Sequence, residues 1–301
     1  MSTTAPEQAP GEADATAERP RRPSLSPSRA ADFMQCPLLY RFRTIDRLPQ
    51  TPSAEAVRGT VVHAVLERLF DLPAPERTLD AARALLGPQW QRLLETEPGL
   101  SVLFPDGDDD ALVTWLASAD ALVERWFTLE DPTRLEPAER ELYVETTLDD
   151  GLVLRGYVDR LDVAPTGDLR VVDYKTGRAP DEAFEAKALF QMRFYALVLW
   201  RARGVVPRLL QLVYLGDGQV LSFEPDESDL LATERKVRAL WEAIETAAAT
   251  GDWRPSPGRL CGWCDHKALC PAFGGTPPPL PAPLELPTPG VGSGSAQGVT
   301  P

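Results

Sequence analysis

The spacing of apolar residues divides this chain into helical and strand-forming regions. Between Ala54 and Asp71, valine, leucine and phenylalanine recur every three or four residues, which predicts an amphipathic helix. Leucine and tryptophan keep a similar spacing between Thr78 and Glu130. This predicts further helices, which we expect to form an insertion at about 76–136 that packs on the core. From Glu139 the apolar residues alternate with polar ones, which is the period of β-strands.

Turn-forming runs separate the predicted strands. The expected order is a short helix after Ser26, strands at about 139–148, 152–164 and 169–175, a helix at 181–203, strands at 209–215 and 220–223, and a helix at 228–250. Asp149-Asp150-Gly151 predicts a hairpin turn. The first helix is expected to have Ser26 as its N-cap and to end near Cys36, because a residue before proline avoids helical geometry.

The composition suits one substantial core with extensions at both ends. The chain has 301 residues, of which 43% are hydrophobic. Residues 1–23 and 274–301 are too poor in apolar side chains to fold, so we expect both to be disordered. No apolar run reaches the length of a membrane span and no secretory signal is present, so we expect a cytoplasmic protein with no membrane partner.

The formal net charge of −14 argues against a nucleic-acid partner unless basic residues are concentrated locally. One such concentration lies near the N-terminus and comprises Arg29, Arg41, Arg43 and Arg47, interleaved with Tyr40 and Phe42. Two interpretations stay open here. The segment is either a surface that grips a nucleic-acid backbone, or a solvated helix face with aromatic residues in the core.

The strand at 169–175 carries the clearest candidate for chemistry. Side chains alternate along a strand, so Asp173 and Lys175 project from one face, and the preceding strand would bring Asp159 close to them. Two carboxylates and a lysine suit metal-assisted hydrolysis, because carboxylates bind hard divalent cations and the lysine can orient water or stabilise charge on phosphate. The plainer alternative is an ion pair on a solvated strand face.

Two helices carry further candidates. His63 lies inside the predicted helix at 54–71, with Gly59 one turn earlier on the same face, which indicates a close approach by a backbone or a ligand. A single helical histidine is more often structural. Gln191 and Tyr195 lie one turn apart on the helix at 181–203.

Four cysteines indicate metal or cluster ligation, because disulfides are rare in a reducing compartment. They are Cys36, Cys261, Cys264 and Cys270. Four thiolates suit tetrahedral zinc or a cubane iron–sulfur cluster, and either would clip the C-terminal segment to the first helix. Alternatively, Cys36 is unrelated and His266 completes a zinc site.

Taken together and in order, these motifs resemble the RecB-family nuclease domain of the PD-(D/E)XK superfamily, specifically its iron–sulfur branch. That branch includes the AddB nuclease domain and CRISPR-associated adaptation nucleases. The motifs are Ser26 to Cys36-Pro37-x2-Tyr40, Arg58-Gly59-x3-His63, Gly156-x2-Asp159-Arg160-x-Asp162, Asp173-Tyr174-Lys175-Thr176-Gly177, Gln191-x3-Tyr195, and the trio of C-terminal cysteines. Val158 stands where the superfamily name has proline, a frequent departure in the RecB branch.

The resemblance implies a restriction-endonuclease-like α/β domain at 24–273. It would have a central mixed β-sheet flanked by helices, the helical insertion, and a segment at 253–271 clipped by its cysteines. It also implies roles for single residues. Mg²⁺ or Mn²⁺ would be held by His63, Asp159, Asp173 and the carbonyl of Tyr174, with Lys175 as the catalytic lysine, Gln191 and Tyr195 as supporting residues, and a [4Fe–4S] cluster rather than Zn²⁺ on the four cysteines.

The implied function is metal-dependent DNA cleavage in repair or recombination. An exonuclease acting on single strands or ends is expected, with a helicase or another repair protein as a partner, because the chain has no helicase phosphate loop of its own. The alternative is a non-catalytic iron–sulfur subunit that binds DNA or serves as a scaffold in a helicase–nuclease complex.

Overall fold

The computed structural model describes residues 23–105, 109–180, 182–282, 284 and 286–288. Most of the predicted N-terminal tail, residues 1–22, and the last part of the predicted C-terminal tail, residues 289–301, lie outside this described part. None of the described helices combines the length and apolar character that a membrane crossing needs.

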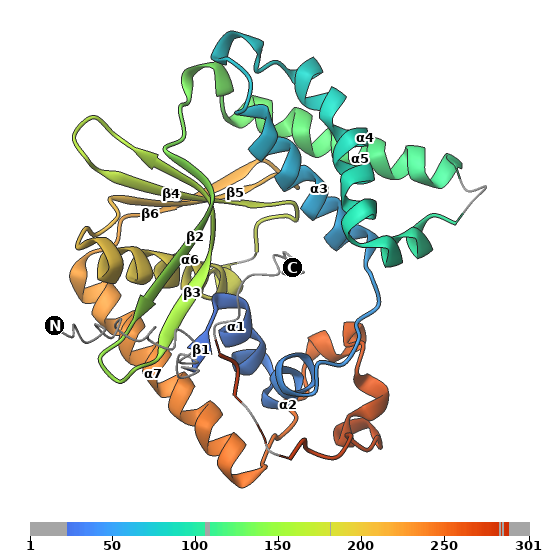
Figure 1. The fold of residues 1–301 in the computed structure, drawn as a ribbon, viewed down its shortest axis with the longest axis vertical. Helices are drawn as coiled ribbons and strands as arrows, with labels where there is room; N and C mark the ends of the chain where they lie inside the picture. The colour runs from blue at the N-terminus through green and yellow to red at the C-terminus, as the bar shows by residue number, and fades with distance from the viewer. Residues whose placement is uncertain (1–22, 106–108, 181, 283, 285, 289–301) are drawn as a thin grey trace, which may run out of the picture.

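Across the described residues, a mixed sheet of six strands forms the centre of the fold (Figure 1). Its strands are β1 (Ser24–Leu25), β2 (Glu139–Thr147), β3 (Val153–Val163), β4 (Leu169–Lys175), β5 (Leu209–Tyr214) and β6 (Gln219–Phe223). They follow the order β1-β3-β4-β5-β6, with β2 along the opposite edge of β3. β2, β3 and β4 form an antiparallel meander, whereas β4 and β5 run parallel. The predicted α/β fold with a mixed sheet is confirmed.

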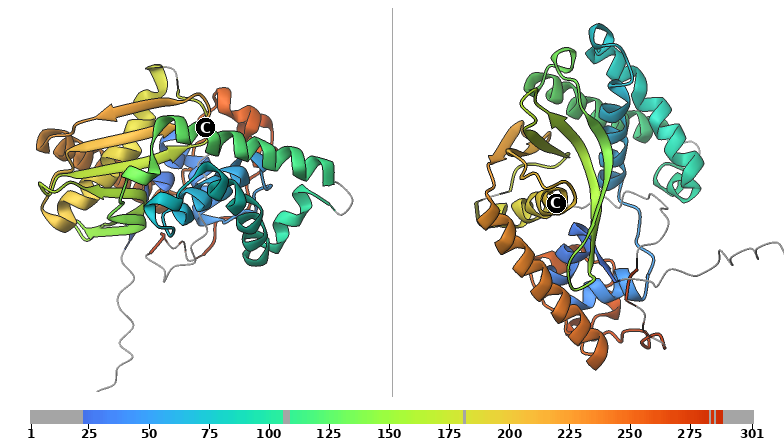
Figure 2. Two further views of the ribbon diagram at one scale, coloured as in Figure 1. Left: turned by 90° about the horizontal axis from the view of Figure 1, so that it is seen from above. Right: turned by 60° about the vertical axis from the view of Figure 1, so that its left-hand side comes forward.

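Helices cover both faces of the sheet, as the right-hand view of Figure 2 shows. The longer helices are α1 (Pro27–Gln35), α3 (Ala54–Leu69), α4 (Leu79–Thr96), α5 (Asp109–Leu129), α6 (Glu182–Arg203) and α7 (Glu227–Thr250). α6 and α7 lie on one face, and α3 lies on the other, where it packs with α4 and α5 as a helical lobe. The short helix α2 (Pro37–Tyr40) and the C-terminal segment lie beside α1, at the end of the sheet away from the lobe (Figure 1).

The residues of β4 show how the sheet divides the core into two layers. Leu169 and Val171 belong to the hydrophobic cluster that includes α6 and α7. Val172 and Tyr174 belong to a second cluster, with α3, α4 and α5. Because side chains alternate along a strand, Asp173 is directed toward the α6 layer, where it is 2% exposed.

The start of α1 follows its sequence signals. Ser26 is the N-cap and its hydroxyl accepts a hydrogen bond from the backbone N–H of Arg29, while Pro27 is the first helical residue. The helix ends at Gln35, so the predicted end near Cys36 is confirmed. Tyr40, which follows in α2, is fully buried.

The aromatic residues of the basic segment near the N-terminus lie in the core and not on a surface. The Phe42 side chain is also buried, and both aromatic side chains of this segment belong to the core cluster of the α6 layer. Arg41 pairs with Asp46 at 2.9 Å, and Arg43 pairs with Asp32 at 2.8 Å. The aromatic residues are therefore core residues, and two of the interleaved arginines are neutralised locally.

The described residues after 273 lie against the core, although their composition predicts disorder. Leu280, Leu284 and Leu286 pack against the α6 layer. The carbonyl of Pro287 accepts a hydrogen bond from the Ser24 N–H at 2.8 Å, and the carbonyl of Pro278 accepts one from Arg41. A proline-rich segment has few N–H donors to satisfy, so a few carbonyl acceptors and three leucines are enough to hold it in place.

A buried ion cluster joins β3 to the helical lobe. Arg160 is 1% exposed and donates to both carboxylate oxygens of Glu130, at 2.7 and 2.8 Å. Its Nε lies 3.1 Å from Asp162, and the Tyr174 hydroxyl also contacts this guanidinium. A buried charge with this many partners is costly to leave unpaired.

We therefore expect Glu130→Ala to lower the free energy of unfolding by about 3 kcal/mol, because Arg160 would keep its buried charge without its bidentate partner. Guanidinium unfolding curves followed by circular dichroism measure the change. Asp120→Ala is the matched control. It removes a half-exposed pair with Arg83 and should cost less than about 1 kcal/mol. Equal costs for the two variants would contradict this assignment.

Candidate active site

The site forms where β3 and β4 separate. Their pairing runs from Val163–Leu169 to Arg160–Val172 and ends there. The next free backbone donor, the N–H of Tyr174, bonds instead to Oδ2 of Asp159 at 2.7 Å. The Asp159 carboxylate is therefore held between the two diverging strands. This places it next to β4, as expected from the sequence.

His63 reaches this carboxylate from α3. Its Nδ1 lies 3.4 Å from Oδ2 of Asp159, and its ring stands edge-on to the Tyr174 ring at 6.2 Å. Gly59 makes the approach of α3 possible, because a Cβ at this position would lie 3.2 Å from Oγ1 of Thr176 at the end of β4. The predicted close approach at the glycine is therefore an approach by the backbone of α3 to β4.

Asp173 and Lys175 form the second half of the site, against α6. Nζ of Lys175 lies 2.7 Å from Oδ2 of Asp173 and donates to Oε1 of Gln191 at 2.9 Å. The amide of Gln191 donates to Oδ1 of Asp173 at 3.0 Å and contacts the Tyr195 hydroxyl at 3.2 Å. Gln191 therefore holds both the carboxylate and the ammonium group in place.

The loop after Lys175 is fixed by β5 and the helical lobe. The N–H groups of Leu215 and Gly216 donate to the carbonyls of Lys175 and Gly177, at 2.7 and 2.9 Å. A Cβ at Gly216 would lie 2.3 Å from the Gly177 oxygen, so the contact requires glycine. Arg125 of α5 donates to the Leu215 carbonyl at 2.8 Å, which braces the loop from the lobe.

Glu141 of β2 also lies at the candidate site, although no sequence motif marks it. One ligand atom from each of His63, Glu141 and Asp159 can be chosen so that all three lie within 4.8 Å of one another. Glu141 has a φ of 44°, a strained conformation for a residue that is not glycine. No pairing forms between Glu141 and Asp159, although the pairs on either side of them are intact. Strain of this kind clusters at functional sites.

The acidic side chains disturb one another's ionisation. Burial, together with the charge of Asp159, raises the pKa of Glu141 to about 7. Burial and the same charge raise the pKa of Asp173 to about 6, against the opposing effect of Lys175. Burial alone would lower the pKa of His63, but Asp159 outweighs it and that pKa rises to about 9. The site thus holds more negative charge than its protein cations neutralise, and a bound cation would relieve this excess.

The donor set fits a divalent metal ion. The imidazole of His63 and the carboxylates of Glu141 and Asp159 converge. The buried carboxylate of Asp173 is near enough to Asp159 for the charge of Asp159 to raise its pKa. Oxygen donors with one imidazole are ligands that Mg²⁺ and Mn²⁺ accept. The structure thus brings together His63, Asp159, Asp173 and Lys175, the four side chains expected to form the site.

The cysteines lie at the end of the molecule away from the helical lobe, where α1 meets the C-terminal segment. Burial, and the proximity of Cys261 and Cys36, raise the pKa of Cys264. The backbone N–H of Ser256 donates to the Cys36 sulfur and that of Gly258 to the Cys261 sulfur, each at 3.3 Å. Cys36 and Cys270 both pack against the α6 layer, and all four thiols are half-buried and free. Such N–H donors to sulfur suit thiolate ligands of a metal or cluster.

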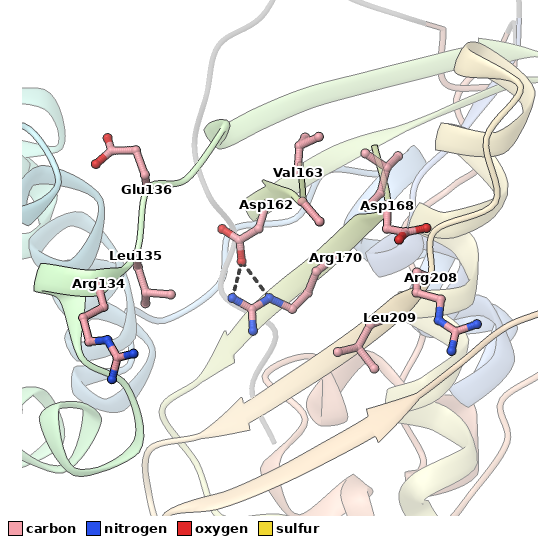
Figure 3. Close-up of a pocket in the computed structure, with 11 residues that line it drawn as sticks. Arg134, Leu135, Glu136, Asp162, Val163, Asp168, Arg170, Arg208 and Leu209 are labelled. Atoms are coloured by element: carbon pink, nitrogen blue, oxygen red, sulfur yellow. Dashed lines mark hydrogen bonds and ion pairs between the residues drawn. The ribbon is translucent and has the colours of Figure 1, made fainter. Parts of the chain in front are cut away.

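A cavity of about 420 Å³ lies at the start of β4, at the opposite end of that strand from Lys175 (Figure 3). It is lined by three arginines and three carboxylates, namely Arg134, Arg170, Arg208, Glu136, Asp162 and Asp168, over an apolar floor. Asp162 and Arg170, which are register partners on β3 and β4, pair at 2.8 Å in its wall. None of the residues expected to form the active site lines this cavity, so it is separate from the candidate active site.

Similar proteins occur in mycobacteriophages. The Gene 69 protein of Mycobacterium phage D29 is 27% identical over 281 residues, which cover 83% of this chain and 97% of the phage protein. The Gene 69 protein of Mycobacterium phage L5 is 24% identical over 291 residues, with the same coverage. These similarities extend over almost the whole length of both phage proteins.

A solved structure shares the fold. The crystal structure of a "Putative exonuclease" from Eubacterium rectale matches with a TM-score of 0.54 at 13% identity, covering 85% of this chain and 94% of that one. The family model of the PD-(D/E)XK nuclease superfamily matches residues 24–271, which include every residue of the candidate active site. This chain belongs to the PD-(D/E)XK nuclease superfamily.

Proposed function

We propose that this protein is a deoxyribonuclease that hydrolyses phosphodiester bonds with Mg²⁺ or Mn²⁺ and acts from strand ends. One observation carries the proposal. Lys175 and Asp173 are held together by Gln191, beside the three convergent donors His63, Glu141 and Asp159. A module that only binds DNA has no need of a lysine in this position.

The side chains would have separate roles. His63, Glu141 and Asp159 would hold the cation, assisted by Asp173 and by the carbonyl of Tyr174. When bound, the ion would polarise the phosphodiester and lower the pKa of the attacking water.

Lys175 would orient that water or stabilise the negative charge that develops on the phosphate. Gln191 would keep the lysine in place, and Tyr195 would support Gln191 through its hydroxyl. The exonuclease assignment is supported by the resemblance to RecB-family nucleases and by the name of the similar Eubacterium rectale protein.

We further propose that the four cysteines hold a [4Fe–4S] cluster. Support comes from the grouping of Cys36 with Cys261 and Cys264, and from the N–H donors to two of the sulfurs. The cluster would join α1 to the C-terminal segment and so stabilise the end of the molecule away from the helical lobe.

Lys175→Ala should lower the cleavage rate at least 100-fold, because general acid–base or charge stabilisation by one positioned group contributes about that much. The measurement is digestion of end-labelled single- and double-stranded DNA with Mg²⁺ or Mn²⁺ by anaerobically purified protein. The matched control is Lys236→Ala, which removes an exposed lysine from α7 and should leave the rate unchanged.

Unchanged cleavage by folded Lys175→Ala protein would overturn the catalytic assignment. If the wild-type protein binds DNA but cleaves none with either ion, the chain is instead a non-catalytic DNA-binding or scaffold subunit.

Glu141→Gln should weaken Mn²⁺ binding tenfold or more, because it removes one of the convergent carboxylates. Titration calorimetry and the Mn²⁺ concentration for half-maximal cleavage should shift together. Glu139→Gln, on an exposed residue of the same strand, serves as the control and should bind Mn²⁺ as the wild type does. An unshifted Mn²⁺ affinity in Glu141→Gln would exclude Glu141 from the ligand set.

Protein purified without oxygen should be brown and contain iron and acid-labile sulfide. Cys264→Ala should lose the colour and also lower the unfolding temperature, because the ligands tie two distant segments together. Elemental analysis measures the metal. Stoichiometric zinc in a colourless protein would replace the cluster with a zinc site.

A further inference from the structure

Arg29 is held without a counter-charge. Within the described residues its guanidinium makes no ion pair, and its Nη1 is shielded from solvent with no hydrogen-bond partner. Arg41 and Arg43, in the same segment, each have a carboxylate partner. A shielded guanidinium nitrogen without an acceptor is costly, and an anion that reached this side chain would supply one.

Two further arginines lie close to Arg29 and increase the local positive charge. Burial, then the like charge of Arg155, and more weakly that of Arg47, lower the pKa of Arg29. Arg155 belongs to β3, and Arg47 follows the π-helical turn Arg41–Ile45 with a φ of 51°. Arg155 and Arg47 thus lie within electrostatic range of Arg29, in a protein whose formal net charge is −14.

An exposed aromatic pair adjoins these arginines. Tyr143 of β2 and Tyr157 of β3 are register partners, 44% and 45% exposed, with ring centroids 5.2 Å apart. Arg155 lies beside the Tyr143 hydroxyl, which also donates to Glu145. Large rings left this open to solvent offer faces on which another planar group can stack.

The pair is close to the candidate metal ligands. Tyr143 is two residues from Glu141, and Tyr157 is two residues from Asp159. A strand rises about 3.3 Å per residue, so the rings lie roughly 7 Å along the hairpin from the ligands, and Arg155 lies roughly 13 Å from Asp159. The neighbours of the two tyrosines, Leu142, Val144 and Val158, pack in the α6 layer, so the rings stand on the other face of the hairpin, from which His63 of α3 reaches Asp159. A DNA strand leaving the metal site along this face would meet the rings and then Arg155.

We propose that this strip binds the single-stranded end of the DNA substrate, with bases stacked on the rings and phosphates bound by the guanidinium groups. The strip comprises Tyr143, Tyr157, Arg155, Arg29 and Arg47. The inference rests on the proposed nuclease function, and it adds the surface and the residues that would bind the single-stranded end. Stacking faces next to a cationic track are how proteins bind single strands without sequence preference, and paired bases would not present their faces to the tyrosines.

The first test measures binding in EDTA, where cleavage cannot occur. Fluorescence anisotropy of a labelled oligothymidylate is followed against salt concentration. Arg155→Gln and Arg47→Gln should each weaken binding about tenfold and reduce the slope of log K against log salt by about 0.7, the value for one phosphate contact on a single strand. Arg29→Gln should act in the same way.

Arg208→Gln is the matched control, because it removes an exposed arginine at the cavity near the start of β4. It should leave both the affinity and the slope as in the wild type. Thermal unfolding is recorded for each variant. Because Arg47 is exposed, its variant tests the proposal even if Arg29→Gln fails to fold. Slopes equal to that of Arg208→Gln in the folded variants would overturn the proposal.

The rings are tested by a pair of substitutions. Tyr157→Leu should weaken oligothymidylate binding about tenfold, and Tyr157→Phe should not, because phenylalanine keeps the stacking face. In cleavage assays the leucine variant should raise KM and leave kcat within about twofold. An equal loss in both variants, or the same loss on a blunt duplex of equal length, would overturn the single-strand assignment. Absence of cleavage by the wild type, with the binding pattern intact, would overturn only the nuclease function.

Discussion

The geometry of the site depends on the hydrogen bond between the Tyr174 N–H and the Asp159 carboxylate. Where β3 and β4 stop pairing, each strand leaves backbone groups that need new partners. Oδ2 of Asp159 accepts a hydrogen bond from one of them, the N–H of Tyr174, at 2.7 Å. The carboxylate is thereby fixed where the two strands separate. Glu141 and His63 are then brought to this carboxylate from β2 and α3, so one satisfied backbone donor positions groups from four elements.

Acidic and basic side chains occupy different places around the point where β3 and β4 separate. The carboxylates lie in the opening between the strands, where burial and the charge of Asp159 raise the pKa values of Glu141 and Asp173. A second group of carboxylates neutralises buried Arg160, on the side of β4 that faces the helical lobe. Arg29 makes no ion pair within the described residues, and Arg155 and Arg47 add like charge near it. A strongly acidic protein can therefore have a basic surface next to an acidic site.

Local periodicity was sufficient to predict the bounds of β4, the caps of α1 and the facing of Asp173 and Lys175, because each depends on neighbouring residues only. Glu141 could not be recognised that way, since no motif marks it. The hairpin turn at 149–151 does contain the missing information. Its register pairs positions whose numbers sum to 300, which sets Glu141 opposite Asp159. The strained φ of Glu141 and the packing of the proline-rich segment depend on distant contacts that no local pattern encodes.

The position of β1 has a consequence for the order in which the molecule can assemble. Ser24 pairs with Val153 in the middle of the chain and bonds to Pro287 near its end. A ribosome releases the chain from its N-terminus, so the first strand has no partner until β3 has emerged, and its hydrogen bond to Pro287 forms only after residue 287 has been made. β1 can therefore join the sheet only after the hairpin of β2 and β3 has been synthesised.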